Sequence, residues 1–220
     1  MPLFGKLSGG SRPGYEPAVG ELVADALGRP LEWVVRPWAQ FYPELDAGGG
    51  DAVLCGQGIT ESRMQQVDFT RPYAVFDESV IVRAGEGIAS QADLAGKRVG
   101  AIAGSTNMAL AETFDGAVAV PFDGASDDVF GEMIAALRAG EVDAVVDDDV
   151  ALIPLAGDDA FEIAFTVPTH NRWGMAVSKR RPEWRDELDR ALAGVIEDGR
   201  LRAAWERWMP ELTYPFGARA

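Results

Sequence analysis

The sequence has few residues of several types, and each shortage excludes a class of protein. It contains one cysteine, Cys55, so no disulfide can form within the chain. It contains one histidine, His170, and no Cys/His cluster accompanies it that could bind zinc. Only 20 Lys and Arg stand against 35 Asp and Glu, which are too few cations to neutralise nucleic-acid phosphates. We therefore expect no metal, no cofactor and no nucleic-acid partner.

Long apolar runs are also missing. None approaches the length of about 18 residues that a membrane-spanning helix needs. The first twenty residues lack the basic and apolar regions of a signal peptide, so the sequence predicts none within this chain. Apolar residues make up 47% of 220, enough for one large domain or two small lobes. The net charge of −15 has two explanations, solubility or a cationic ligand. Cys55 itself is typical of a small buried apolar side chain.

Hydrophobic periodicity predicts helices alternating with strands, which favours parallel sheets in an α/β fold. The predicted helices cover residues 16–27, 39–47, 107–114, 126–139 and 182–208, the last broken at Gly199. The predicted strands cover residues 31–35, 52–55, 79–83, 97–103, 118–122, 143–146, 161–167 and 174–178.

The segment from Asp51 to Tyr73 carries the most specific pattern. A buried strand is followed by a glycine turn, a threonine and an arginine, and then by an aromatic segment. This order resembles the signature of the family 3 solute-binding proteins, the extracytoplasmic receptors of polar amino-acid ABC transporters. The matching positions are Asp51, Gly56, Thr60, Arg63, Val67, Asp68, Phe69, Pro72 and Tyr73. The resemblance covers nearly the whole chain and includes residues 93–100, 104–106, 173–177 and 198–201.

The resemblance implies an α/β fold of the two-lobe periplasmic-binding-protein-like type (type II), with each sheet flanked by helices. Lobe I would comprise residues 1–82 and 176–220, and lobe II residues 83–175. Two crossing strands would act as hinges near Arg83 and Gly174. The implied function is capture of a polar amino acid or similar small zwitterion between the lobes for ABC-type import. The implied protein is an extracytoplasmic monomer that is not an enzyme, and its partner is the ABC permease.

The sequence departs from the family pattern at two places. Family members begin with a strand and then a turn ending in Pro-x-Phe or similar, and residues 1–4 are all that remains of these here, so the first strand of lobe I would be missing. We expect upstream codons for that strand, preceded by a signal or lipoprotein peptide. The second departure is Gly58, where the family usually has Thr or Ser. One hydroxyl contact to the ligand would then be lost.

Three segments place polar groups directly after a predicted strand, namely residues 56–63, 104–107 and 147–149. Ligands of open α/β sheets bind beyond the carboxyl ends of the strands, so this rule selects these segments. The fork of donors on Arg63 suits a carboxylate, although a lone arginine is often simply a surface residue. Thr60 could donate to the same anion or only cap the following turn.

The remaining candidates have equally plain alternatives. Ser105 and Thr106 begin a predicted helix, where free N–H groups bind anions, but they could only cap the helix. The Asp148 carboxylate could accept bonds from an ammonium group or cap the next helix. The resemblance assigns the ligand carboxylate to Arg63 and the α-ammonium to Asp148. It also places Trp38 at the border of the cleft, while packing in the core of lobe I is the alternative.

Two other functions stay open. Cyclohexadienyl dehydratases resemble the same family and would need a general acid over a carboxylate-bearing ring, for which no residue can be assigned. A ligand-sensing domain of a larger receptor is the third hypothesis.

Overall fold

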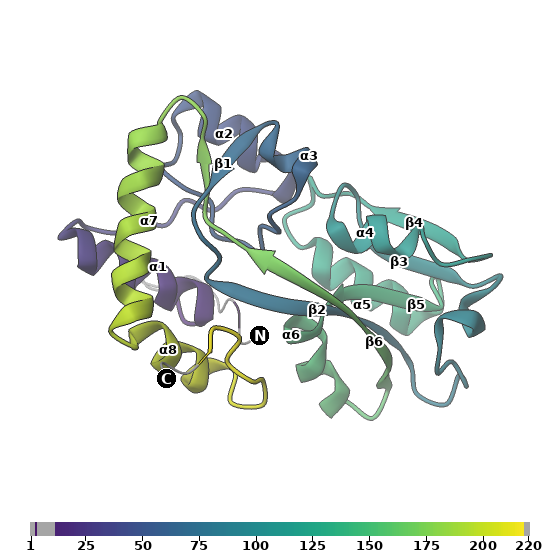
Figure 1. Cartoon of the computed structure of the whole chain (residues 1–220). Coiled ribbons are helices and arrows are strands. Elements are labelled where there is room, and N and C mark those ends of the chain that lie inside the picture. The colour runs from purple at the N-terminus through teal and green to yellow at the C-terminus, as the bar shows by residue number, and fades with distance from the viewer. Residues whose placement is uncertain (1–2, 4–11, 218–220) are drawn as a thin grey trace. The chain divides into compact units, whose positions relative to one another are not determined.

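The computed structural model describes Leu3 and residues 12–217. The chain forms two compact units. Unit 1 contains the chain up to Val35, Gln40–Val75 and the chain from Asn171; unit 2 contains Arg36–Ala39 and Phe76–His170. The chain is traced in Figure 1. A division by compactness does not test where hinges lie, so the expected lobe limits at 82/83 and 175/176 stay a prediction. Met1, Pro2 and Phe4, on which part of the first-strand expectation rests, lie outside the described residues.

Three helices of unit 1 pack against one another, namely α1 (Tyr15–Leu27), α7 (Pro182–Glu197) and α8 (Arg200–Trp208) (Figure 1). The ring of Tyr15 meets Trp205 edge-on with centroids 5.4 Å apart, and its hydroxyl donates to the carbonyl oxygen of Tyr73 at 2.5 Å. Gly199 separates α7 from α8 with φ of +85°, a conformation that favours glycine. The predicted helices 16–27 and 182–208 are therefore confirmed. No helix of the described part has the length and apolar character that crossing a membrane requires.

The remaining helices of unit 1 are shorter. The expected helix 39–47 is confirmed as η1 (Trp38–Gln40) followed by α2 (Phe41–Ala47), and Gly48 ends it with φ of +79°. Residues Trp38 and Ala39 of η1 belong to unit 2. The helix α3 (Glu61–Met64) was not expected from the sequence.

The described strands of unit 1 are few. β1 (Val67–Phe69) pairs antiparallel with β7 (Ala176–Ser178), with Phe69 opposite Ala176. The predicted strand 52–55 contributes only a single bridge, between Val53 and Ala176. The predicted strand 31–35 is wrong, because neither described sheet includes it and Val35 is 56% exposed. An apolar pattern favours an extended chain, but a strand also needs a ladder of backbone hydrogen bonds in register.

Unit 2 is built on a five-stranded sheet in the order β4-β3-β5-β2-β6. β3 is parallel to β4 and β5, whereas β2 runs antiparallel to β5, so the expectation of parallel sheets holds for three strands only. The strands are β2 (Ala74–Arg83), β3 (Arg98–Ile102), β4 (Val118–Phe122), β5 (Ala144–Asp148) and β6 (Phe161–Trp173). The helices are η2 (Gln91–Leu94), α4 (Thr106–Ala111), α5 (Val129–Ala139), α6 (Asp149–Leu152) and η3 (Ile153–Gly157).

Side chains alternate between the two faces of this sheet, as the pleat requires. Val80 and Val82 of β2 pack on one face, with Leu94 and Phe114. Ile81 packs on the other face. Its neighbours there include Met133, Leu137, Val145 and Leu152. The central strand β5 is thus covered on both faces, which explains why it is buried along its whole length.

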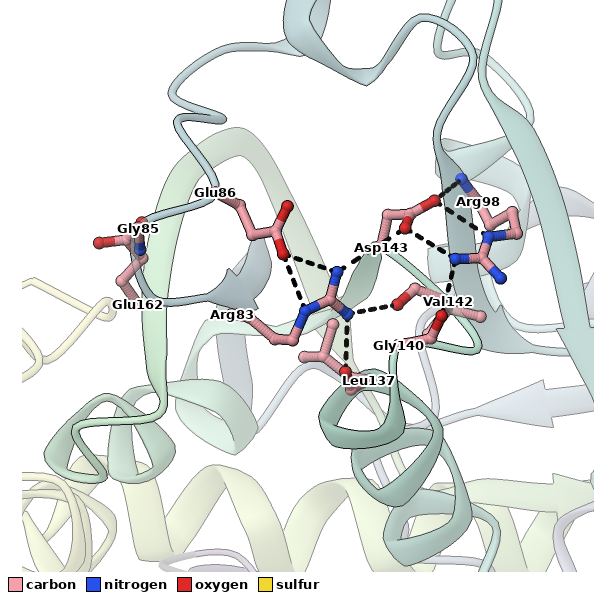
Figure 2. A network of polar contacts seen from close by, with 9 residues as sticks. All are labelled: Arg83, Gly85, Glu86, Arg98, Leu137, Gly140, Val142, Asp143 and Glu162. Atoms are coloured by element: carbon pink, nitrogen blue, oxygen red, sulfur yellow. Dashed lines mark hydrogen bonds and ion pairs between the residues drawn. The ribbon is translucent and has the colours of Figure 1, made fainter.

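A polar network holds the turn between α5 and β5 (Figure 2). Arg98 binds the Asp143 carboxylate through two guanidinium nitrogens, at 2.8 and 3.1 Å. Arg83 donates to the carbonyl oxygens of Leu137 and Val142, each at 2.8 Å. Hydrogen bonding from Arg98 is the main reason that the pKa of Asp143 falls to about 2. The network fixes the start of β5, the strand that ends at Asp148.

Replacing Asp143 with asparagine should destabilise unit 2 by about 1 kcal/mol at pH 7. The full pKa change would imply more, but Arg98 is 44% exposed and water screens the pair. A lowered folded-state pKa contributes stability above the unfolded value near 4, and this contribution is lost as pH falls toward 2. Urea unfolding at pH 7 and pH 3 should therefore show the gap between parent and D143N shrinking at the lower pH. Asp158→Asn, which breaks the more exposed Arg138 pair, should cost less; an equal loss would contradict the assignment.

Candidate functional site

In unit 1, the candidate residues lie on one loop and the short helix that follows it. The Thr60 side chain caps α3 by accepting from the backbone N–H of Arg63 at 3.2 Å. Arg63 is only 7% exposed, and its Nη1 donates to the carbonyl oxygen of Gly58 at 3.1 Å. Arg63 is therefore not a surface side chain. The helix start and the Gly58 carbonyl hold its guanidinium against the loop.

The loop itself is held by bonds from distant parts of unit 1. The N–H of Gly56 donates to the Glu16 carboxylate at 2.7 Å. The Gln57 side chain donates to the carbonyl oxygen of Cys55 at 2.7 Å and accepts from the Tyr42 hydroxyl at 2.8 Å. Gly56 has φ of +56°, the left-handed region that glycine tolerates. These bonds fix the loop that carries Gly58 and thereby the anchor of Arg63.

Glu16 is the buried acid behind this loop, with no exposed surface. Burial raises its pKa to about 7, although the hydrogen bond from the Gly56 N–H offsets part of the rise. An N–H bond of this kind favours the ionised form, because the carboxylate is the better acceptor. The charge on Glu16 therefore changes near neutral pH, directly behind the Gly56 turn.

In unit 2, Ser105 and Thr106 stand at the start of α4. The Ser105 hydroxyl caps the helix by accepting from the N–H of Met108 at 3.0 Å. Ser105 is 7% exposed, and Thr106 is half-buried. The capping role considered for Ser105 is thus realised, which leaves a ligand contact as a separate hypothesis.

The end of β5 lies beside this helix. Asp147 accepts from the side chain of Asn107 at 3.1 Å and from the N–H of Asp148 at 2.8 Å. Asp148 occupies the cap position of α6, but its side chain makes no capping bond. The alternative that residues 147–149 only cap this helix is therefore wrong for Asp148, whereas the Asp149 side chain does accept from the N–H of Val150 at 2.6 Å. The bond between Asn107 and Asp147 joins the two segments of unit 2 that the sequence selected.

Several acids gather around the end of β5. Glu78 of β2 lies opposite Asp148 in the antiparallel register, so the two side chains share one face of the sheet. Burial, and then repulsion from neighbouring acids that include Asp77 and Asp147, raises the pKa of Glu78 to about 7. Burial likewise raises the pKa of Asp147 to about 6 and that of Asp149 to about 6. A cation near this cluster would be favoured electrostatically.

Trp38 does not belong to the core of unit 1. Residues 36–39 group with unit 2, and the Trp38 ring is half-buried there. A side chain on Gly124 would approach the Trp38 ring to 3.0 Å, and the N–H of Ala39 donates to the carbonyl oxygen of Gly124 at 3.0 Å. Trp38 is not one of the fully buried core residues, and a position at the cleft border stays a prediction.

The structure thus brings Gly58, Thr60 and Arg63 together in unit 1. In unit 2 it joins the start of α4, which Ser105 caps, to the end of β5 through the bond between Asn107 and Asp147. The sequence pattern did not single out Gln57, Glu78 or Asn171. Glu78 could have been noted as an acid inside an apolar strand. The place of Asn171 depends on how the end of β6 pairs with the loop at Gly58, and no local signal encodes that.

Comparison with known proteins gives a family match over most of the chain. Residues 3–211 fit the sequence model of the bacterial extracellular solute-binding proteins, family 3. The chain is 28% identical over 171 residues to the ABC transporter glutamine-binding protein GlnH of Bacillus subtilis. That match covers 77% of this chain and 61% of GlnH, less than two thirds of that relative's length. The histidine-binding periplasmic protein of Salmonella typhimurium is 28% identical over 214 residues, which are 90% of this chain and 79% of that protein.

Solved structures give the same fold. An ancestral arginine-binding protein bound to arginine has a TM-score of 0.84 and 29% identity, covering 94% of this chain and 93% of its own. An ancestral amino-acid-binding protein, described as a precursor of cyclohexadienyl dehydratase, has a TM-score of 0.82 and 25% identity, covering 94% and 90%. The expected two-lobe α/β fold of periplasmic binding proteins is confirmed.

Replacing Glu78 with glutamine should stabilise the ligand-free protein at pH 8 by about 1–2 kcal/mol. A carboxyl whose folded pKa is raised stabilises the fold fully below its unfolded value near 4, and this contribution is lost as pH rises through about 7. Thermal unfolding at pH 5 and pH 8 should thus show a smaller decrease in melting temperature for E78Q than for the parent.

Glu16→Gln should flatten the same profile independently, since its pKa is raised in the same direction. Glu211→Gln, a change at an exposed glutamate, is the matched control and should leave the pH profile unaltered. Identical profiles for parent, E78Q and E16Q would refute the assigned protonation.

Proposed function

Because the chain belongs to the bacterial extracellular solute-binding proteins of family 3, we propose that it captures a free amino acid outside the cytoplasm for import by an ABC transporter. In this proposal the two units supply opposite ends of the site. Arg63 of unit 1 binds the ligand carboxylate, and Asp148 of unit 2 accepts from the ligand ammonium. Closure around the ligand would be the signal that the permease reads. The names of the relatives, an ABC transporter glutamine-binding protein and a periplasmic histidine-binding protein, support this function.

The observation that carries the proposal is the placement of Arg63. A guanidinium is seldom buried unless it binds an anion, because removing its charge from water is costly. Arg63 is nearly buried, and its Nη1 donates to the carbonyl oxygen of Gly58, which holds the guanidinium at the loop. A carboxylate is the ligand that fits a guanidinium fork. Each charged hydrogen bond would contribute on the order of 1.5–3 kcal/mol.

Asp148 supports the other end of the proposed clamp. It is 9% exposed and is not used to cap α6. An ammonium group that donates to it would also reduce the repulsion among Glu78, Asp147 and Asp149. A cationic side chain on the ligand would add to this effect, so L-arginine is the first probe that we would choose. The solved relative bound to arginine supports the same choice.

The dehydratase hypothesis is supported less well. The relative linked to that enzyme is itself described as an amino-acid-binding protein. A turnover assay with prephenate and arogenate tests the alternative directly. Measurable turnover would replace the transport proposal with an enzymatic one.

The mutational test of the clamp uses Arg63→Ala and Asp148→Asn. Each removes one member of a desolvated charged pair with the ligand, which should weaken binding of L-arginine by about 2–5 kcal/mol, or roughly 30- to several-thousand-fold. Isothermal titration calorimetry measures the change. Arg185→Ala on α7, where the arginine pairs with Asp186, is the control and should bind like the parent. If both cleft variants bind as tightly as the parent, the site lies elsewhere.

A panel of the twenty amino acids in a thermal-shift assay should accompany this experiment. A stabilising shift with at least one amino acid is expected, because a ligand that binds only the folded state raises the melting temperature. No shift with any member would contradict the proposed function as a whole.

A further inference from the structure

We infer that Asn171 is a ligand-contacting residue, whose side-chain amide binds the same carboxylate as Arg63. This inference rests on the proposed function, since it needs a ligand with a carboxylate. It concerns unit 1 alone, to which both residues belong.

The backbone brings Asn171 to the loop. The end of β6 runs antiparallel to the loop, with a bridge between Gly58 and Trp173. The N–H of Ile59 donates to the carbonyl oxygen of Arg172 at 2.7 Å, and the N–H of Gly174 donates to that of Gln57 at 3.1 Å. These bonds, one on each side of the bridge, fix the register. Asn171 is therefore held beside the loop by backbone pairing.

The side chains converge on one point. A Cβ atom built on Gly58 would lie 2.6 Å from Oδ1 and 3.2 Å from Nδ2 of Asn171. The same point lies 3.2 Å from Nη1 of Arg63. The amide and the guanidinium thus flank the α-carbon of Gly58 together. The space that a side chain at position 58 would fill is taken by these two polar groups.

The glycine at position 58 is explained by this crowding. Gly58 is absent from the glycines with positive φ, so its backbone conformation does not require glycine. A side chain at position 58 would instead displace Asn171. The lack of a side chain here leaves room for the Asn171 amide, of which Oδ1 is the nearer atom and Nδ2 the donor, and for the Arg63 guanidinium.

The chemistry of the pair suits a carboxylate. The guanidinium supplies charge and planar donors, and the amide supplies a neutral donor at a different angle. A carboxylate has two oxygens with about four lone-pair directions, so it can accept from both at once. Asn171 is half-buried, which leaves part of its surface accessible to a ligand.

The first test is Asn171→Ala, with binding of L-arginine measured by calorimetry. Loss of one hydrogen bond to a charged group should weaken binding about 10- to 100-fold. Gly58→Ala should weaken it to a similar degree, because the new methyl group pushes the Asn171 amide aside. In the double variant N171A/G58A the second change should add little, since no amide remains to displace. Gly50→Ala, in the same unit with open space around it, is the matched control and should bind like the parent.

A second test separates a ligand contact from a residue that only positions Arg63. In an Arg63→Ala background, N171A should still lower the residual affinity for L-arginine, because the amide binds the carboxylate itself. If N171A has no effect once Arg63 is gone, Asn171 acts only through Arg63 and the inference is overturned. Melting temperatures of all variants show whether each is folded. If N171A does not fold, the loss of L-arginine binding in G58A still tests the inference.

The outcomes also distinguish this inference from the proposed function. If the parent binds L-arginine and N171A binds it equally well, the inference fails and the proposed function stands. If the parent does not bind L-arginine, the inference fails together with the choice of that ligand.

Discussion

The pairing of the end of β6 with the loop at Gly58 is the interaction on which the candidate site of unit 1 depends. Two backbone bonds and the bridge between Gly58 and Trp173 hold the loop from one side. Glu16 and Tyr42 hold it from the other. Arg63 in turn rests on the carbonyl oxygen of this loop. Most of β6 belongs to the five-stranded sheet of unit 2, and its last residues, from Asn171, belong to unit 1. The same strand therefore also shapes the candidate site of unit 1.

Carboxylates serve two opposite purposes in this protein. Asp143 lies near the surface with Arg98, so its pKa is lowered and its charge supports the fold. Glu78 is buried beside other acids, so its pKa is raised and its ionisation opposes the fold. Such an arrangement is typical of functional sites, where stability is given up for a group that binds something else.

Local sequence rules predicted most helices because caps and periodicity are local properties. Gly28, Gly48 and Gly140 each end a helix in the left-handed conformation, as their positions after apolar stripes indicate. The strands of unit 2 were found at least in part for the same reason, since short apolar segments mark β3, β4, β5 and the predicted parts of β2 and β6. The strand expected at 31–35 failed because pairing is not local. β1 was missed because three residues give too short a pattern.

The sequence by itself determined the family, the loop segment that carries Arg63, the strand end at Asp148, and the loop glycines, because spacing along the chain encodes them. It could not determine that Arg63 is buried, that Thr60 and Ser105 are caps, or that Trp38 groups with unit 2. Nor could it place Asn171 over Gly58, which lies more than a hundred residues away in the chain. The physical reason is that burial, pKa and close approach depend on neighbours from distant segments. Only the tertiary structure, through strand register and packing, decides which of those neighbours meet.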